Sequence, residues 1–313
     1  MHLIVASLMA LSAGQADKVE LTRKFAAGEK MTCDFASRVD AEMRQYPIET
    51  FFPDNVDFTY TFTLDVEKMK PDGVADVRFK RKEFKIRMAE DFESGPKTTV
   101  MAQNANMLIT FSNRNQILSI KDETPKKPPA GGGALRVLSR FGVKVQDPIM
   151  QMIQQLHSFA AFANFYDFGP SLPLRPVAVG DTWKETIGYT PMTISSGAEK
   201  GKSLMGRVDY LYTYKGNASI DNKTCVWIQG KIAVDTDAAP FIATFFERPE
   251  FSPFKEIKLF MDGTVDYYLE PANLATYKIV SKSEGNASIS VKDYSGGPVF
   301  EERFKSQGKL VRK

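Results

Sequence analysis

Residues 58–67 read Phe-Thr-Tyr-Thr-Phe-Thr-Leu-Asp-Val-Glu, a strict alternation of apolar and polar side chains. Successive side chains of a β-strand point to opposite faces, so this stretch predicts a strand with one buried and one solvated face. A Pro-Asp-Gly sequence at 71–73 supplies a turn, and Ala75, Val77 and Phe79 begin a return strand with the same period. Together they predict a β-hairpin and a chain that is mainly β.

Alternation of this kind recurs along most of the chain. The apolar set that resumes at Phe84 is one residue out of register with the set that ends at Phe79, and a bulge or kink near Arg81 would reconcile the two. Residues 107–120 predict two more strands around a polar turn. Further strands are predicted at 207–214 and 225–234, and at 257–261 and 265–269 on either side of Asp262-Gly263. A last hairpin is predicted to join 277–280 to 289–291 through a turn at 284–286.

A short step of the form Gly-acid-x-apolar occurs twice, as Gly-Glu-Lys-Met at 28–31 and as Gly-Asp-Thr-Trp at 180–183. Each copy opens a stretch that runs into long alternating strands. We therefore expect two similar antiparallel β halves with curved sheets, the first at 17–124 and the second at 171–313.

The segment between these halves, residues 125–170, has a different composition. Its first part is rich in Pro and Gly, which is typical of a flexible linker. Asp147-Pro148 then offers an N-cap and a first-turn proline, and Gly169-Pro170 ends the pattern. Between them apolar residues recur at helical spacing, so we expect a helical insert between or against the sheets, and an α+β variant of the β class. The apolar stripe comprises Ile149, Met152, Ile153, Leu156, Phe159, Ala160, Phe162 and Ala163.

Composition excludes some classes of protein. The 313 residues are 43% hydrophobic and 25% charged, as in ordinary globular proteins. A formal net charge of +3 is too close to balance to indicate nucleic acid as a partner.

The first 16 residues predict a secretory signal peptide. An apolar run at 3–13 is followed by the small residues of a cleavage site at 14–16. We expect a soluble protein exported to the periplasm or beyond the cell, because no later segment is long and apolar enough to span a bilayer.

No residue pattern indicates catalysis, a metal or a cofactor. After removal of the signal peptide His157 is the only histidine, and a packed or hydrogen-bonded role beside the apolar stripe explains it. Catalysis by paired carboxylates stays the least favoured of the alternatives, since their pairing is invisible in sequence.

Cys33 and Cys225 are the only cysteines. In an exported protein they could form one disulfide that ties the two halves together, or remain two buried free thiols. The sequence leaves both alternatives open.

Two apolar loops fall at matching places in the two halves, around Phe51-Phe52 and around Phe245-Phe246. Neither keeps a strand or helix period, so these rings form either a second core layer or the lips of an apolar ligand site. On the second interpretation the lining residues are Phe51, Phe52, Ile153, Leu156, Phe159, Phe162, Phe245 and Phe246.

Residues 173–183 read Pro-Leu-Arg-Pro-Val-Ala-Val-Gly-Asp-Thr-Trp, which resembles a segment of exported bacterial families of unknown function. A structural role is available for both motif residues: a turn carboxylate at Asp181 and an anchoring indole at Trp183. The wider layout looks like the periplasmic lipoprotein-carrier and mycobacterial lipid-carrier folds. That resemblance implies a curved antiparallel sheet with a helix on its concave face.

These observations favour a non-enzymatic binding protein of the cell envelope, whose ligand is apolar, such as a lipid or an acyl chain. The alternative is a structural or interaction module that docks an envelope protein through its sheet edges and Phe loops.

Overall fold

The computed structural model describes residues 17–88, 97–101, 105–124, 168–189, 206–243, 250 and 252–313. The alternating stretches form strands, as their period predicts. The first group comprises β1 (Lys30–Gln45), β2 (Phe52–Pro53), β3 (Val56–Met69), β4 (Ala75–Arg81), β5 (Phe84–Met88), β6 (Lys97–Met101), β7 (Ala105–Phe111) and β8 (Ile117–Asp122). The second group comprises β9 (Thr182–Tyr189), β10 (Gly206–Ile220), β11 (Lys223–Asp237), β12 (Phe254–Leu269), β13 (Thr276–Val291) and β14 (Phe300–Arg312).

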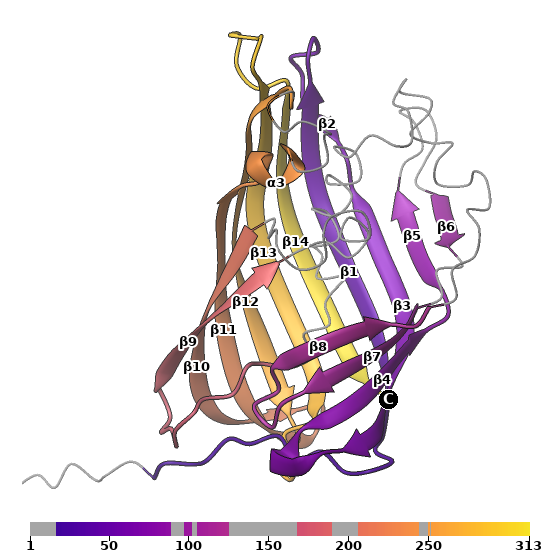
Figure 1. Cartoon of the computed structure of the whole chain (residues 1–313), viewed down its shortest axis with the longest axis vertical. Helices are drawn as coiled ribbons and strands as arrows, with labels where there is room; N and C mark the ends of the chain where they lie inside the picture. The colour runs from indigo at the N-terminus through magenta and orange to yellow at the C-terminus, as the bar shows by residue number, and fades with distance from the viewer. Residues whose placement is uncertain are drawn as a thin grey trace, which may run out of the picture.

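All of these strands belong to one antiparallel sheet (Figure 1). Its order is β8-β7-β4-β3-β1-β14-β13-β12-β11-β10-β9, with β2, β5 and β6 attached beside β1 and β3. The expectation of two separate halves is therefore wrong. The halves merge because β1 pairs with β14 along its length, from Cys33 opposite Arg312 to Gln45 opposite Phe300. Each strand would otherwise leave a long row of unpaired backbone groups at a sheet edge.

The sheet is open but strongly curved. The main strand order ends at β8 and β9. Figure 1 shows the sheet bending so that β4, β7 and β8 come round in front of the long strands. At one end the edges meet through side chains: Gln116 Nε2 donates to Glu185 Oε1 at 3.0 Å. We call this the closed end.

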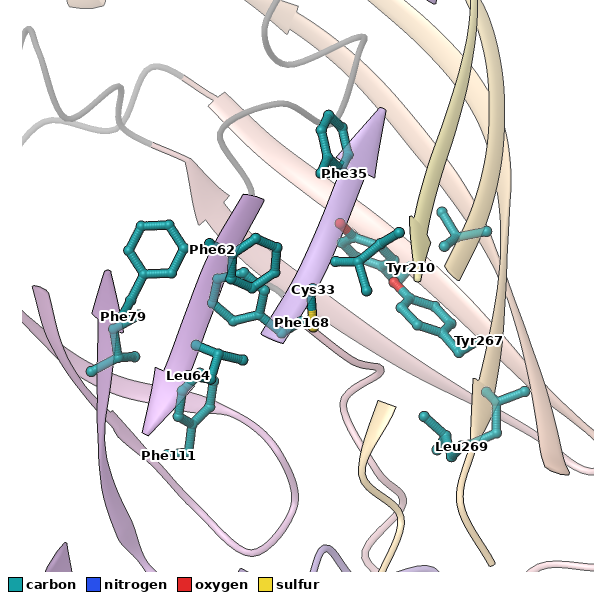
Figure 2. Close-up of a cluster of buried hydrophobic side chains, with 14 of the residues drawn as sticks. Cys33, Phe35, Phe62, Leu64, Phe79, Phe111, Phe168, Tyr210, Tyr267 and Leu269 are labelled. Carbon is teal, nitrogen blue, oxygen red and sulfur yellow. The ribbon is translucent and has the colours of Figure 1, made fainter. Parts of the chain in front are cut away.

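Each long strand has a buried concave row and an exposed outer row. In β1 the buried row runs through every second residue from Met31 to Ala41. Side chains from distant strands meet on the concave side, where Phe62 and Phe79 lie near Phe168, and Tyr210 and Tyr267 come from the opposite wall (Figure 2). The core is thus enclosed by one curved sheet.

The hairpin predicted around 71–73 is confirmed. A 3-10 turn, η1 (Pro71–Gly73), joins β3 to β4, and Asp72 and Gly73 adopt positive φ values of 61° and 72°. The kink predicted near Arg81 is also confirmed. β4 ends at Arg81 and pairs with β7, whereas β5 begins at Phe84 and pairs with β6, so the change of register marks a change of neighbour.

The repeated Gly-acid step has the same local structure in both places. Gly28 and Gly180 have φ values of 76° and 92°, which glycine tolerates best. The Gly28 amide donates to Val66 O, and the Gly180 amide donates to Tyr214 O in the same way. Each step therefore starts a strand on the edge of a neighbouring one, although the halves it opens are not separate domains.

The closed end is covered by two extended segments. Residues 168–173, 177 and 178 are buried, with Leu172 at 1% exposure, whereas residues 174–176 are exposed. Arg114 Nε donates to Leu172 O at 2.7 Å. The N-terminal segment 17–29 crosses beside it and forms a two-way backbone bridge between Val19 and Val177.

The predicted signal peptide, the Pro/Gly linker and the helical stripe of 149–163 lie outside the described residues. In the described part of the chain the one α-helix is the short α3 (Ala239–Ala243), which packs on β12. No helix among those residues has the length and apolar character needed to cross a membrane.

Candidate functional site

The concave face of the sheet divides into two apolar zones. The aromatic zone lies toward the closed end. Ring centroids there are 5.3 Å apart between Phe62 and Phe79, and 5.0 Å between Phe62 and Phe168. These separations are typical of packed aromatic pairs. The zone comprises Phe35, Tyr60, Phe62, Phe79, Phe168, Tyr210, Tyr212 and Tyr267.

The aliphatic zone occupies the other end of the same face. Its members are no more than 6% exposed, and Ile257, Leu259, Ala287 and Ile289 lie outside the core cluster that includes Phe168 and Leu172. The segment that covers the closed end therefore packs on the aromatic zone. The aliphatic zone comprises Val39, Ala41, Val56, Val234, Ile257, Leu259, Met261, Ala287 and Ile289.

Four serines interrupt the apolar surface between these zones. Ser37 on β1 and Ser281 on β13 both lie opposite Gly308 of β14, and Ser283 lies opposite Ser306 in the next row. Their exposures are 7%, 2%, 8% and 2% for Ser37, Ser281, Ser283 and Ser306. We call these residues the serine patch.

One carboxylate is also buried on the concave face. Glu302 of β14 is 1% exposed and lies opposite Met43 on one side and Ala287 on the other. It belongs to the aliphatic end of the face, four residues along β14 from Ser306.

An ion pair anchors the segment that crosses the closed end. Arg23 Nη2 lies 2.6 Å from Glu29 Oε1, and the two side chains are only 3% and 10% exposed. Burial lowers the pKa of Arg23, while the hydrogen bond and the charge of Glu29 oppose that shift. Arg23 also donates to the Asn273 carbonyl at 3.2 Å, so it ties the N-terminal segment to the β12–β13 turn.

The motif residues Asp181 and Trp183 have the structural roles expected of them. Asp181 Oδ2 accepts from the Ala178 amide at 3.0 Å and closes a turn. Trp183 Nε1 donates to Ser171 O at 2.7 Å, and its ring stacks on Tyr212. The indole thereby fixes the covering segment to β9 and β10.

The structure places two of the eight predicted lining residues. Phe51 lies beside the guanidinium groups of Arg44 and Arg303, whose carbons are 5.2 and 4.7 Å from its ring centroid. Arg303 belongs to the outer row of β14, so this ring lies on the outer side of the sheet. Phe52 pairs with Met43 in β2. Ile153, Leu156, Phe159, Phe162, Phe245 and Phe246 lie outside the described residues.

The two cysteines are free and buried, so the disulfide is not formed. Cys33 belongs to β1 and Cys225 to β11, with β14, β13 and β12 between them. Neighbouring strands are ~4.8 Å apart, which places the pair beyond the roughly 7 Å between Cα atoms that a disulfide tolerates. Burial raises the pKa of the Cys33 thiol to about 12.

A groove of about 580 Å³ lies on the outer face, across β5, β3, β1, β14 and β13. The sequence analysis did not predict this groove. Basic residues at the solvent-facing positions of several strands could have indicated it. Arg38 is paired with Asp40 at 2.7 Å, and Arg87 lies 4.0 Å from Asp57. Charged side chains of the outer rows, partly neutralised by these pairs, border the groove, and its lining also includes Ser37, Ser281 and Gly308. Its basic lining residues are Arg38, Lys85, Arg87, Lys282 and Lys309.

No protein-family model and no curated protein matches the sequence. Among solved structures the chain is similar to lipovitellin, in a structure concerned with lipid–protein interactions, at 11% identity and a TM-score of 0.41. That match covers 93% of this chain and 25% of the lipovitellin chain, so this chain spans about a quarter of its length. The chain is also similar to DynF from the dynemicin biosynthesis pathway of Micromonospora chersina, at 9% identity and a TM-score of 0.25, over 95% of this chain and 86% of that one.

Proposed function

We propose that this protein binds an apolar ligand, such as a lipid or an acyl chain, on the concave face of its sheet, without chemical turnover. One observation supports the proposal above others: four residues of the aliphatic zone form a buried apolar surface outside the core cluster that contains the aromatic zone. They are Ile257, Leu259, Ala287 and Ile289. The location of this surface at the end away from the closing segments suits a ligand that enters lengthwise.

The sequence of β12 illustrates how consistently this face is apolar. Its concave row from Ile257 to Leu269 carries no charged side chain, and its one polar group is the hydroxyl of Tyr267, whereas the outer row carries Lys258, Asp262 and Asp266. Burying an apolar chain yields ~25 cal/mol per Å² removed from water, so a long acyl chain needs a surface of this kind more than it needs hydrogen bonds.

The test places one tryptophan on each face. In a background with Trp183→Phe and Trp227→Phe, Phe300→Trp reports from the concave face and Phe260→Trp from the outer face. Phe300 is 8% exposed and Phe260 is 41% exposed, and both changes exchange one aromatic ring for another. Delipidated protein is then titrated with a brominated fatty acid, because bromine quenches indole fluorescence at short range.

We expect the bound chain to quench the tryptophan at 300 and to leave the tryptophan at 260 bright. Equal quenching at the two positions would indicate adsorption to the surface. Absence of quenching at both, together with no bound lipid in native mass spectra of gently purified protein, would refute the proposal.

A specific observation also favours the alternative of an interaction module. The edge strand β8 is exposed along its whole length, and in the described part of the chain its only strand partner is β7. Its apolar residues Ile117, Leu118 and Ile120 are 38%, 57% and 38% exposed. An exposed apolar edge is a template for pairing with another strand, and a second copy of this chain would supply one.

This alternative is tested by molar mass at rising concentration, with light scattering after size-exclusion chromatography. We expect a dimer that Leu118→Lys abolishes, because a lysine at an edge opposes strand addition. The control Lys121→Arg keeps the charge of a neighbouring β8 position. A monomer at all concentrations removes this candidate.

A further inference from the structure

We propose that the serine patch, Ser37, Ser281, Ser283 and Ser306, receives an uncharged polar group of the ligand, so that the ligand is a neutral amphiphile rather than a plain hydrocarbon or an ionised lipid. The inference rests on the proposed function and makes it more specific. An ester, hydroxyl or amide on an apolar chain is the chemistry that fits.

The patch is compact and spans three adjacent strands. Ser37 and Ser281 are separated by Gly308, which has no side chain, so they lie two strand spacings or roughly 10 Å apart. Ser283 and Ser306 face each other at roughly 5 Å between Cα atoms. The two rows are two residues apart, roughly 7 Å, so one small polar group can reach hydroxyls of both rows.

Two of these hydroxyls lack the partner that burial demands. Ser37 Oγ and Ser306 Oγ are buried, and no hydrogen-bond partner for either is found among the described residues. Buried polar atoms in proteins are nearly always hydrogen-bonded, and leaving one unpaired costs ~1–3 kcal/mol. Such a cost is offset when a ligand brings donors or acceptors to the same place.

The surroundings of the patch argue against a charged group. Ser37 and Ser306 are flanked on the concave face by Val39 and Phe304, which are 0% and 8% exposed. On β1, β13 and β14 the nearest charged concave residues are Glu302 and Arg312, four positions from Ser306 and from Gly308. Four residues span ~13 Å of strand, so on these three strands no cation lies within hydrogen-bond reach of a phosphate or carboxylate held at Ser37 or Ser306. The nearest cation on the other wall is Arg81 of β4, whose guanidinium carbon lies 5.1 Å from the ring centroid of Tyr60, and this ring stacks on Phe35.

The position of the patch also fits an amphiphile. It lies between the aromatic and the aliphatic zones, so a polar group held there leaves apolar surface along the strands on either side. A single-chain ester would place its head at the serines and its chain along the aliphatic zone.

The test compares head groups on one chain length. Phenylnaphthylamine, an uncharged fluorophore that brightens in apolar surroundings, reports occupancy of the concave face. Monolauroylglycerol and lauryl phosphate then compete with it for wild-type protein and for the double variant Ser37→Ala, Ser306→Ala. The control is Ser252→Ala, which removes another buried hydroxyl without a partner in the described chain, just before β12 and away from the patch.

We expect wild-type protein to prefer monolauroylglycerol over lauryl phosphate. The double variant should bind monolauroylglycerol about tenfold more weakly, as the loss of two hydrogen bonds implies. Its affinity for the fluorophore and its melting temperature should not fall, since alanine removes unpaired hydroxyls and nothing else. Ser252→Ala should leave every affinity unchanged.

The failures of the two proposals are distinguishable. If the fluorophore binds but monolauroylglycerol competes equally well against wild type and the double variant, the serine patch is not a head-group site, while the apolar site stands. Preference for lauryl phosphate would overturn the neutral head group. If neither the fluorophore nor any competitor binds wild-type protein, the proposed function itself fails.

Discussion

At the scale of single residues, the burial of Cys33 makes its thiol unreactive. Because burial raises its pKa to about 12, the thiol is protonated far above physiological pH and carries almost no nucleophilic thiolate. We expect an aromatic disulfide reagent at pH 8 to leave Cys33 unmodified in the native protein and to modify both cysteines in denaturant. Peptide mapping by mass spectrometry reads out each site. Rapid native labelling of Cys33, or an intact mass that indicates a disulfide, would contradict the structure.

The ion pair at the closed end gives a second prediction at this scale. Glu29→Gln leaves the buried Arg23 guanidinium without its carboxylate, and breaking a buried pair in this way costs ~3–5 kcal/mol. The matched control is Asp40→Asn in the exposed Arg38–Asp40 pair, for which we expect no measurable loss, because water screens this pair. Urea unfolding measures both free energies. Equal losses would mean that Arg23 is solvated.

The roles of some single residues at the site could be predicted from the sequence, and those of others could not. The roles of Asp181 and Trp183 were predictable because a turn carboxylate and an anchoring indole act on backbone groups nearby in sequence. The position of Phe51 was not, because its neighbour Arg303 comes from the last strand of the chain.

At the level of the strands, replacing glycines distinguishes two constraints: a backbone conformation that favours glycine, and a lack of space for a side chain. Gly180 has φ 92° and an added Cβ would meet nothing within 4 Å, so Gly180→Ala should cost about 1 kcal/mol of backbone strain. Gly285 on β13 has an ordinary φ, but its Cβ would collide with the Phe260 carbonyl oxygen of β12 and with the Phe304 ring.

Gly285→Ala should therefore disrupt the β12–β13 pairing and cost about 3 kcal/mol or more. Thermal unfolding of the two variants ranks them. A larger effect at Gly180 than at Gly285 would show that strain at the turn outweighs packing between the strands.

Many stretches of strand were predictable, because period-two alternation depends only on neighbouring residues. The turn predicted at Asp262-Gly263 and the hairpin turn predicted at 284–286 are wrong, because these residues lie inside the continuous strands β12 and β13 and pair with each other. The kink after Arg81 was visible as a slip in that period. The pairing partners of the strands were harder to predict. β5 follows β4 in the chain but pairs with β6 instead of β7, and the alternation does not specify that choice.

On the scale of the whole molecule, the β1–β14 pairing predicts a single cooperative unit. The strands that open and close the chain are hydrogen-bonded neighbours, so neither part can unfold without breaking that pairing. We expect the urea midpoint from labelling of Cys33, on β1, to coincide with the midpoint from fluorescence of Trp183 and Trp227, on β9 and β11. Two separate midpoints would show that the two parts of the chain unfold independently.

From alternation, turn glycines and composition, the sequence by itself determined that the chain is mainly β, where many of its strands lie, and which faces those strands bury. These properties depend on residues within a few positions of one another. Only the tertiary structure decided that the two parts form one curved sheet, that Cys33 and Cys225 lie too far apart to bond, and that four serines from three strands share one buried patch. Each of those outcomes is set by the register between strands distant in sequence. That register depends on which edges pair and how the sheet bends, and local periodicity does not encode either.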